Sequence, residues 1–201
     1  MDATSVSPAE DLVTRARGGD LRAFAALVES THERAVRVAY GLVGNWEDAR
    51  ELSQDAYVKA YERLGQFDGR SGFYTWYYRI LTNTCRDHLR RRRLVQWLPL
   101  ARRKDPEEAE ETVDVEDRSA GADPSGKASD RETLNALHRA LVKLSGRQRE
   151  VFVLRYQDDR SLAEIAGALG LSTGAVKAHL WQATQKVRLA LRQDGIVAEG
   201  D

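Results

Sequence analysis

The sequence has one cysteine, Cys85, four prolines and no long apolar run in its 201 residues. A single cysteine cannot form a disulfide within the chain, which is typical of proteins from a reducing compartment. No segment approaches the roughly 20 apolar residues that a membrane-spanning helix needs. The first residues, MDATSVSPAEDLV, also lack the basic stretch and the following apolar stretch of a secretory signal. These absences predict a cytoplasmic protein without membrane insertion.

Residues that carry metal or nucleophilic chemistry are few and scattered. The four histidines, His32, His88, His138 and His179, lie far apart in the sequence, and neither an HExxH nor a CxxC spacing occurs. No serine stands in a nucleophile motif, and no P-loop pattern is present. The sequence therefore predicts no catalytic residue, no metal site and no cofactor, and it gives an enzyme little support.

The formal net charge is zero, yet the charges are unevenly distributed along the chain. Residues 1–104 carry 18 Lys and Arg against 13 Asp and Glu, and residues 133–201 carry 10 against 7. Residues 105–132, by contrast, carry 3 basic and 11 acidic side chains. Two mildly basic blocks therefore flank an acidic one, so the overall charge says little about the partner of each block.

Three prolines, Pro99, Pro106 and Pro124, fall in or beside the acidic stretch. The flanks contain no proline from Ala9 to Leu98 or from Ser125 onward, which allows long helices there. The stretch KDPEEAEETVDVEDRSAGADPSGKASD has no aromatic residue and few large apolar ones, so it cannot bury enough surface to fold alone. Strict period-two alternation is absent, so no strand is expected.

These patterns predict an all-α protein of two small helical domains joined by a flexible acidic linker. A chain of 201 residues suits either one large domain or two small ones. The expected ranges are 1–98 for the first domain, 99–132 for the linker, 133–193 for the second domain and 194–201 for a short tail.

Helix signals recur throughout the first domain. Asp20 and Asn45 are expected N-caps, and Gly41 and Gly44 suggest a break between helices. Apolar residues follow Asp20 at helical spacing, at Phe24, Leu27, Val28 and Val38. The helix after Asn45, WEDARELSQDAYVKAYERL, has an apolar face of mostly small residues. Its other face carries the polar side chains Asp48, Glu51, Gln54 and Asp55. On composition alone, that polar face is a solvated helix surface.

The segment GFYTWYYRILTNTCRDHLRRRR, residues 72–93, combines aromatic residues with a run of arginines. Helical spacing predicts one apolar stripe, which we interpret as core: Phe73, Trp76, Tyr77, Ile80 and Leu81. The other side chains mix rings, an amide and cations, as DNA-binding surfaces do. They are Tyr74, Tyr78, Asn83, Arg86 and Arg90. The run Arg90–Arg93 fits either a solvated helix end or a phosphate-binding segment.

The second domain contains two capping boxes, SGRQ at 145–148 and SLAE at 161–164. The second box opens the helix LAEIAGAL, Gly170 ends it, and Ser172 caps the helix TGAVKAHLWQATQKV. Two capped helices with a short glycine-containing turn predict a helix-turn-helix unit. Such a unit either binds DNA or merely packs as a helical hairpin.

If the unit binds DNA, its second helix presents the side chains that contact the duplex. The candidates are Ser172, Thr173, Lys177, Ala178, His179, Trp181, Gln182 and Lys186. The lysines would neutralise phosphates, whereas side chains in the N-terminal half would reach base edges. Trp181 fits two positions equally well, against DNA or in the core.

Two segments resemble a known family. The sequence WEDARELSQDAYVKAYERLGQFDGRSGFYTWYYRILTNTCRDHLRRRR is similar to region 2 of bacterial sigma factors of the extracytoplasmic-function (ECF) group. The sequence LSGRQREVFVLRYQDDRSLAEIAGALGLSTGAVKAHLWQATQKVRLAL is similar to region 4 of the same group. The order, the spacing and the acidic linker also match, and the resemblance extends from about Asp20 to Leu191. It implies the helical bundle of region 2 and the helix-turn-helix of region 4.

The resemblance implies a promoter-specificity subunit that binds core RNA polymerase, recognises the −35 and −10 elements and melts the −10 region. Glu51, Gln54 and Asp55, with Asp48 beside them, match the surface that binds the β′ clamp helices. An acidic, hydrogen-bonding face suits a basic helical partner. The β flap is the other implied contact on core polymerase.

The resemblance also assigns roles in DNA binding. The loop GQFDGRSG matches the segment that captures a base flipped out of the −10 element, with Phe67, Asp68 and Ser71 as the expected pocket formers. The helix after it would hold single-stranded −10 DNA through the set that includes Tyr74 and Arg86. The helix after Ser172 would read duplex DNA at −35.

This sequence departs from the family pattern in the −35 helix. That helix is usually rich in arginine, where this chain has His179, Trp181 and Gln182. Arginine is the usual reader of guanine and glutamine suits adenine, so the −35 sequence is expected to differ from the common one.

Two further partners are implied by the resemblance alone. The acidic linker would thread toward the active-site cleft of polymerase, although on composition it only keeps the chain soluble. A separate anti-sigma protein would cover both domains. The alternative function is a stand-alone helix-turn-helix regulator that binds duplex DNA through the second domain, and it predicts that the Glu51, Gln54 and Asp55 surface is dispensable.

Overall fold

A computed structural model describes residues 8–100 and 128–196, and these residues contain α-helices, one short 3-10 turn and no strand. The helices are α1 (Pro8–Arg17), α2 (Leu21–Glu29), α3 (His32–Val43), α4 (Trp46–Glu62), η1 (Leu64–Gln66), α5 (Phe73–Leu100), α6 (Ala128–Val142), α7 (Gly146–Tyr156), α8 (Leu162–Leu169) and α9 (Thr173–Gln193). The predicted all-α fold class is confirmed. None of the described helices is long and apolar enough to cross a membrane.

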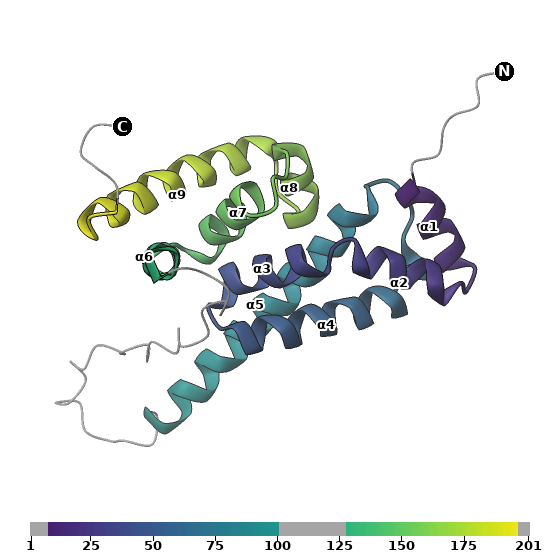
Figure 1. Ribbon diagram of the computed structural model, residues 1–201, viewed down its shortest axis with the longest axis horizontal. Coiled ribbons are helices and arrows are strands. Elements are labelled where there is room, and N and C mark those ends of the chain that lie inside the picture. The colour runs from purple at the N-terminus through teal and green to yellow at the C-terminus, as the bar shows by residue number, and fades with distance from the viewer. Residues whose placement is uncertain (1–7, 101–127, 197–201) are drawn as a thin grey trace.

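Two groups of helices are visible in Figure 1. Helices α3 and α4 pack on each other and on α5, the longest helix, while α1 and α2 pack at one end. Helices α6 to α9 form a second group, in which α9 packs on α6, α7 and α8. The two groups are also in contact, since α5 touches α8 and α3 touches α7. The sequence predicted two domains but not this contact between them.

The predicted caps are present. The Asp20 carboxylate accepts hydrogen bonds from two backbone N–H groups at the start of α2, at 2.9 and 3.2 Å. The Asn45 side chain accepts one from the Asp48 N–H at 3.0 Å. Ser145 and Ser161 both form complete capping boxes, and Ser172 caps α9. These local side-chain bonds satisfy N–H groups that a helix start leaves unpaired, which is why the sequence alone placed these helix starts.

A break between α2 and α3 at Ser30–Thr31 was not predicted. The Thr31 hydroxyl is 2.9 Å from the Leu27 carbonyl oxygen and 2.7 Å from the Tyr57 hydroxyl, deep in the first domain. A threonine side chain that bonds the backbone in this way competes with the continuing helix. The Thr31–Tyr57 contact depends on α4, so the apolar spacing around it could not indicate the break.

The apolar stripe predicted on the long helix lies largely in the core. Phe73, Tyr77, Ile80 and Leu81 are buried, and Trp76 is partly buried beside them. Tyr77 stacks on Tyr57 of α4 with 4.5 Å between ring centroids. The aromatic residues of this segment therefore mostly join α5 to α4 and to the loop before α5.

The described helices extend past the expected linker boundaries. Helix α5 continues to Leu100 and α6 begins at Ala128, inside the range expected for the linker. The remainder of the predicted linker, residues 101–127, lies outside the described residues, as do residues 1–7 and 197–201.

Candidate nucleic-acid interface

Helix α4 presents a polar face to solvent. Glu51, Gln54 and Asp55 are all exposed along one side of the helix. Val58, one turn further on, is 58% exposed and continues the same face. The sequence reasoning missed Val58, although its position three and four residues after Asp55 and Gln54 was a usable signal. An acidic face that ends in an exposed apolar side chain suits a partner helix with basic and apolar residues.

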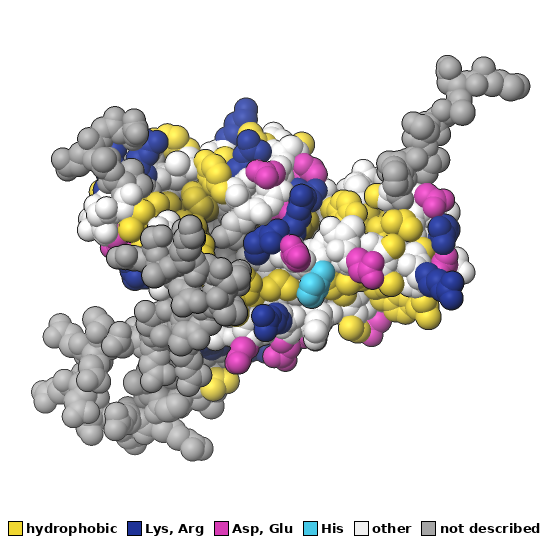
Figure 2. Space-filling view, viewed as in Figure 1, with side chains coloured by type: hydrophobic (Ala, Val, Ile, Leu, Met, Phe, Trp, Pro, Cys, Tyr) yellow, Lys and Arg dark blue, Asp and Glu magenta, His cyan; other side chains and the backbone are white. Residues whose placement is uncertain are grey.

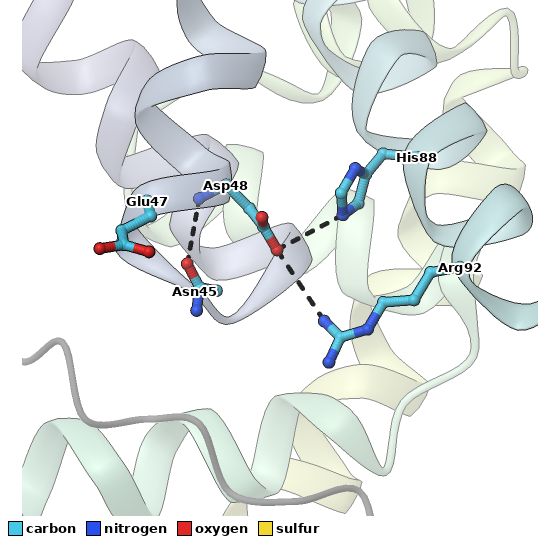
Figure 3. A pocket seen from close by; sticks show the side chains of 5 residues that line it. All are labelled: Asn45, Glu47, Asp48, His88 and Arg92. Carbon is cyan, nitrogen blue, oxygen red and sulfur yellow. Dashed lines mark hydrogen bonds and ion pairs between the residues drawn. The ribbon is translucent and has the colours of Figure 1, made fainter. Parts of the chain in front are cut away.

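Asp48 does not belong to this exposed set. Its carboxylate lies 3.4 Å from His88 Nε2 and 3.9 Å from Arg92 Nη1, both on α5. Figure 3 shows Asp48 pointing toward these two side chains across an open pocket, while Glu47 points away. Asp48 therefore ties α4 to α5, and Arg92 is already paired within the chain. Among the described residues, no group of three or more His, Cys, Asp or Glu side chains is placed to hold a metal ion.

Three residues of the loop before α5 were expected to form the pocket for the flipped base, and one of them lies in the core. Phe67 is buried and packs against Phe73 and Trp76, with ring centroids 6.2 and 5.3 Å away. Its ring is therefore not open to a flipped base, because the start of α5 covers it. Asp68 is exposed and accepts a hydrogen bond from the Arg70 N–H at 3.0 Å, and Ser71 is partly exposed.

Tyr78, expected on the DNA-facing side of α5, is only 1% exposed. Its hydroxyl donates a 2.8 Å hydrogen bond to Asp158 of the loop after α7. Burial, reinforced by the Asp158 charge, raises the pKa of Tyr78, so the phenol stays protonated and remains a donor. Tyr74 is partly buried, and its hydroxyl lies 3.1 Å from that of Ser30. The expected exposure of Tyr78 is thus wrong, because the second domain covers this part of α5.

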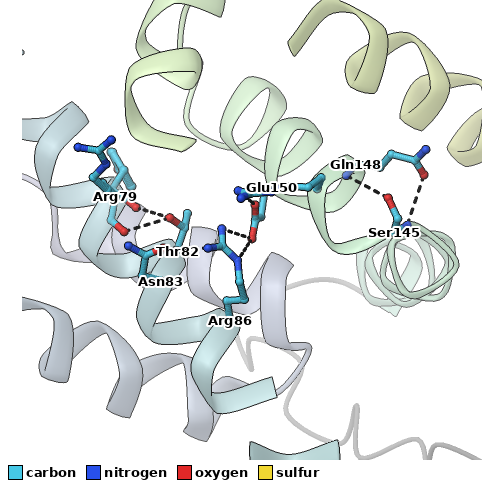
Figure 4. A network of polar contacts seen from close by, with 9 residues as sticks. Arg79, Thr82, Asn83, Arg86, Ser145, Gln148 and Glu150 are labelled. Carbon is cyan, nitrogen blue, oxygen red and sulfur yellow. Dashed lines mark hydrogen bonds and ion pairs between the residues drawn. The ribbon is translucent and has the colours of Figure 1, made fainter. Parts of the chain in front are cut away.

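Further along α5, Arg86 is paired with a residue of α7, whereas Asn83 and Arg90 are exposed. Arg86 donates from Nε and Nη2 to one carboxylate oxygen of Glu150, at 2.9 and 2.8 Å (Figure 4). Asn83 is exposed and accepts from Arg86 Nη1 at 2.9 Å. Arg90 is exposed beside Asp87. Asn83 and Arg90 are therefore accessible, whereas Arg86 is held by α7.

The predicted helix-turn-helix is formed by α8 and α9. Ile165, Leu169 and Val176 are buried between the two helices and their neighbours. Gly170 ends α8 with φ of 65°, in the left-handed region that glycine adopts without steric cost. The turn therefore depends on a glycine at this position, as the sequence indicated.

The candidate residues on α9 differ in whether they contact α7. Thr173, Lys177 and Ala178 are exposed, and Trp181 is 67% exposed on the same outer face. The alternative that places Trp181 in the core is therefore excluded. Gln182 and Lys186 are exposed as well, but both also contact Gln148 of α7, at 2.9 and 3.1 Å.

On the face seen in Figure 2, basic and acidic side chains are mixed.

Each half of the chain matches a known family model. Residues 27–95 match the family model of sigma-70 region 2, and residues 134–187 match that of sigma-70 region 4. The ECF RNA polymerase sigma factor SigW of Bacillus subtilis is 30% identical over 183 residues, which cover 90% of this chain and 95% of SigW. The chain belongs to the ECF sigma factors. Its role is therefore promoter specificity for RNA polymerase rather than that of a stand-alone regulator.

Other proteins are similar to this chain in sequence or in fold. The RNA polymerase sigma-H factor of Pseudomonas aeruginosa is 28% identical, over 91% of this chain and 93% of the relative. Among solved structures, CnrH in complex with the cytosolic domain of CnrY is 27% identical, with a TM-score of 0.67 over 92% of this chain and 97% of CnrH. The sigma factor RpoE of Bartonella quintana, solved with the anti-sigma factor NepR, shares the fold at 22% identity, with a TM-score of 0.65 over 86% of this chain and 98% of RpoE.

Proposed function

We propose that this ECF sigma factor binds core RNA polymerase through α4, reads −35 duplex DNA through α9, and captures and melts the −10 region through α5 and the loop before it. The observation that carries the proposal is the occurrence of region 2 and region 4 in one chain, in that order. Exposed candidate residues lie on both α4 and α9: Glu51, Gln54 and Asp55 on α4, and Thr173, Lys177 and Trp181 on α9. We assign residues 1–98 to core and −10 binding, 99–132 to the linker and 133–193 to −35 binding.

On core polymerase, Glu51, Gln54, Asp55 and Val58 form the proposed contact with the β′ clamp helices. The acidic residues fix how the two partners align and raise the rate of association, and Val58 adds an apolar contact. The second domain would meet the β flap. In this arrangement the protein works in the cytoplasm, where the polymerase and its DNA are.

Melting of the −10 region is driven by binding free energy rather than by nucleotide hydrolysis. Extruding a base costs a few kcal/mol, which contacts to the flipped base and to the strand must offset. Asp68 and Ser71 are the proposed base contacts, while Asn83 and Arg90 contact the strand beside them. The chain carries no catalytic residue in this scheme, so it is a specificity subunit and not an enzyme.

A protein inhibitor is a further proposed partner. The structure of CnrH matches 92% of this chain, and it was solved in complex with the cytosolic domain of CnrY. We propose that an anti-sigma protein binds this chain in a comparable way.

The function is tested by transcription in vitro with core polymerase from a related bacterium and a genomic promoter library. We expect the protein to bind core and to start transcription at a set of promoters that share −35 and −10 sequences. Core polymerase alone, and the protein alone in a DNA-binding assay, are the controls. Failure to bind core, or initiation from no promoter, would contradict the proposed function.

On the outer face of α9, Trp181→Ala is expected to relax selection at one −35 position and to weaken promoters by about tenfold. A mismatched base pair in a specific site costs about 1–3 kcal/mol, and each 1.4 kcal/mol is a factor of about ten. The matched control is Leu189→Ala, which removes another largely exposed apolar side chain about two turns further along α9. Promoter selection from a library randomised at −35 is the measurement, and an unchanged preference would exclude base reading by Trp181.

A further inference from the structure

Gln148, near the start of α7, has a buried amide that contacts two residues of α9. The residue is 7% exposed, and its Nε2 donates to Gln182 Oε1 at 2.9 Å. Its Oε1 accepts from Lys186 Nζ at 3.1 Å. Both partners are exposed and belong to the helix that is proposed to read −35 DNA. One buried side chain therefore holds two candidate DNA contacts.

The direction of the Gln148 amide is fixed by its neighbours. Besides Lys186, the backbone N–H of Ser145 donates to Oε1 at 3.3 Å as part of the capping box (Figure 4). An ammonium group and a backbone N–H can only donate, and a carbonyl oxygen has two lone pairs to accept them. The Gln148 oxygen must therefore face these two donors, which leaves its nitrogen to face Gln182.

This direction in turn fixes the amide of Gln182. The Gln148 nitrogen can only donate, so Gln182 must offer its oxygen, which lies 2.9 Å away. The Gln182 oxygen is then turned toward α7, and its nitrogen, with two N–H groups, is the end left for a ligand. In the part of the chain that the structure describes, no hydrogen bond uses Gln182 Nε2.

The packing of α9 keeps this arrangement in place. Gln182 and Lys186 lie one helical turn apart, so one amide of α7 can contact both. Ala183 and Val187, the residues that follow them, are buried, and α9 packs on α7. Turning the Gln148 amide over would set its N–H groups against the Ser145 N–H and the Lys186 ammonium, which costs the hydrogen bonds of both.

A fixed amide restricts which base Gln182 can read. A glutamine reads adenine with both ends of its amide, because the adenine N6 group donates to the oxygen while N7 accepts from the nitrogen. That pairing requires the oxygen and the nitrogen to lie side by side against one base edge. With its oxygen bonded to Gln148, Gln182 offers the base only N–H donors. Guanine presents two acceptors in the major groove, N7 and O6, so donors alone favour guanine over adenine.

We propose that Gln148 is a positioning residue for −35 recognition: it turns the Gln182 amide so that N–H donors face the DNA and select guanine, and it holds the Lys186 ammonium beside them. This inference rests on the proposed reading of −35 DNA by α9. The preference is then set by α7 as well as by the identity of residue 182. A change at Gln148, which itself touches no base in this scheme, alters which base is selected.

Gln148→Glu tests the proposal because it keeps the size of the side chain and the capping box, in which glutamate serves as glutamine does. One carboxylate oxygen still accepts from Ser145 and Lys186, but the other replaces the donor that faces Gln182. Gln182 must then turn over to donate to that oxygen, which leaves its own oxygen for the base. An outward oxygen accepts from the amino group of adenine or cytosine.

The measurement is transcription by core polymerase with the full chain from a promoter library randomised at −35. Gln182→Ala identifies the position that Gln182 reads, where the unmodified chain is expected to prefer guanine. At that position we expect Gln148→Glu to lower the ratio of guanine to adenine and cytosine about tenfold. The added negative charge weakens all promoters alike and cancels in this ratio. Gln185→Ala, which removes another exposed glutamine of α9, is the matched control and should leave the preference unchanged.

Two further variants separate positioning from a general loss of structure. Gln148→Met has an unbranched side chain of similar length without an amide, so Gln182 is free to turn, and we expect adenine to be accepted as well as guanine. Gln148→Glu combined with Gln182→Ala should show the same preference as Gln182→Ala alone. Thermal unfolding of each variant shows that it is folded.

A guanine preference that stays unchanged in both Gln148 variants would overturn the inference and leave the proposed function intact. The same holds if Gln182→Ala changes no −35 preference, or if the unmodified chain prefers adenine at the position that Gln182 reads. Initiation from no promoter by the unmodified chain would overturn the proposed function and the inference with it.

Discussion

Replacing Glu51 and Asp55 of α4 together with lysine is expected to lower the affinity for core RNA polymerase by about a hundredfold. Opposing like charges across an interface costs several kcal/mol, and each 1.4 kcal/mol is a factor of about ten in affinity. Both side chains are exposed and have no hydrogen bond or ion pair among the residues that the structure describes, so the fold should be unaffected. Titration of core polymerase into fluorescently labelled protein, at two salt concentrations, measures the change.

Glu29→Lys with Glu33→Lys is the matched control. These residues are also exposed glutamates of the first domain, and the double change alters the net charge by the same amount. They lie on α2 and α3 rather than on α4. Asp48 is left unchanged in both variants because it is already tied to His88 and Arg92. If the α4 variant binds core as tightly as the control does, this face is not the polymerase contact.

Asn83→Ala is expected to change which −10 sequences support transcription, by about tenfold or more between favoured and disfavoured bases. Asn83 is exposed on α5, and an amide that contacts a base edge contributes about 1–3 kcal/mol of discrimination. Arg93→Ala, by contrast, is expected to weaken every promoter to the same degree, because a phosphate contact carries no sequence information. Transcription from a library randomised at −10 separates the two effects.

Salt dependence provides the second readout for these variants. Loss of one phosphate contact lowers the salt dependence of DNA binding by about one unit of slope, so Arg93→Ala should show a shallower dependence than Asn83→Ala. Arg93→Lys keeps the charge and should retain it. Arg93 is preferable to Arg92 for this test, because Arg92 contacts Asp48. Altered sequence preference in Arg93→Ala, or uniform weakening in Asn83→Ala, would reverse the assigned roles.

Local features of this protein followed from the sequence alone. The caps at Asp20, Asn45 and Ser172 were predictable because each depends on a side chain and a backbone N–H two or three residues away. The capping boxes and Gly170 defined the helix-turn-helix in the same way. The core stripe of α5 followed from helical spacing, since an apolar face must be buried against something.

Only the tertiary structure showed which residues cover each face of a helix. Spacing could not distinguish the buried Tyr78 from the exposed Asn83, since Tyr78 is buried by Asp158, 80 residues away in the sequence. From the sequence, Asp48 was expected on the exposed polar face of α4, but it pairs with His88 of α5. Phe67 was expected to line a pocket in the loop, but its ring packs against Trp76 at the start of α5.

The candidates on α9 were distinguished in the same way, because only the packing of α7 shows that Gln182 contacts Gln148 and that Trp181 lies outside the core. Sequence periodicity reports that a face is apolar or polar, and the identity of its partner depends on contacts between distant segments. For this ECF sigma factor the sequence determined the helices, their caps and the family. The contact of the two domains, and with it the pairing of Tyr78 and Arg86 with carboxylates of the second domain, arose only when α7 and α8 packed on α3 and α5.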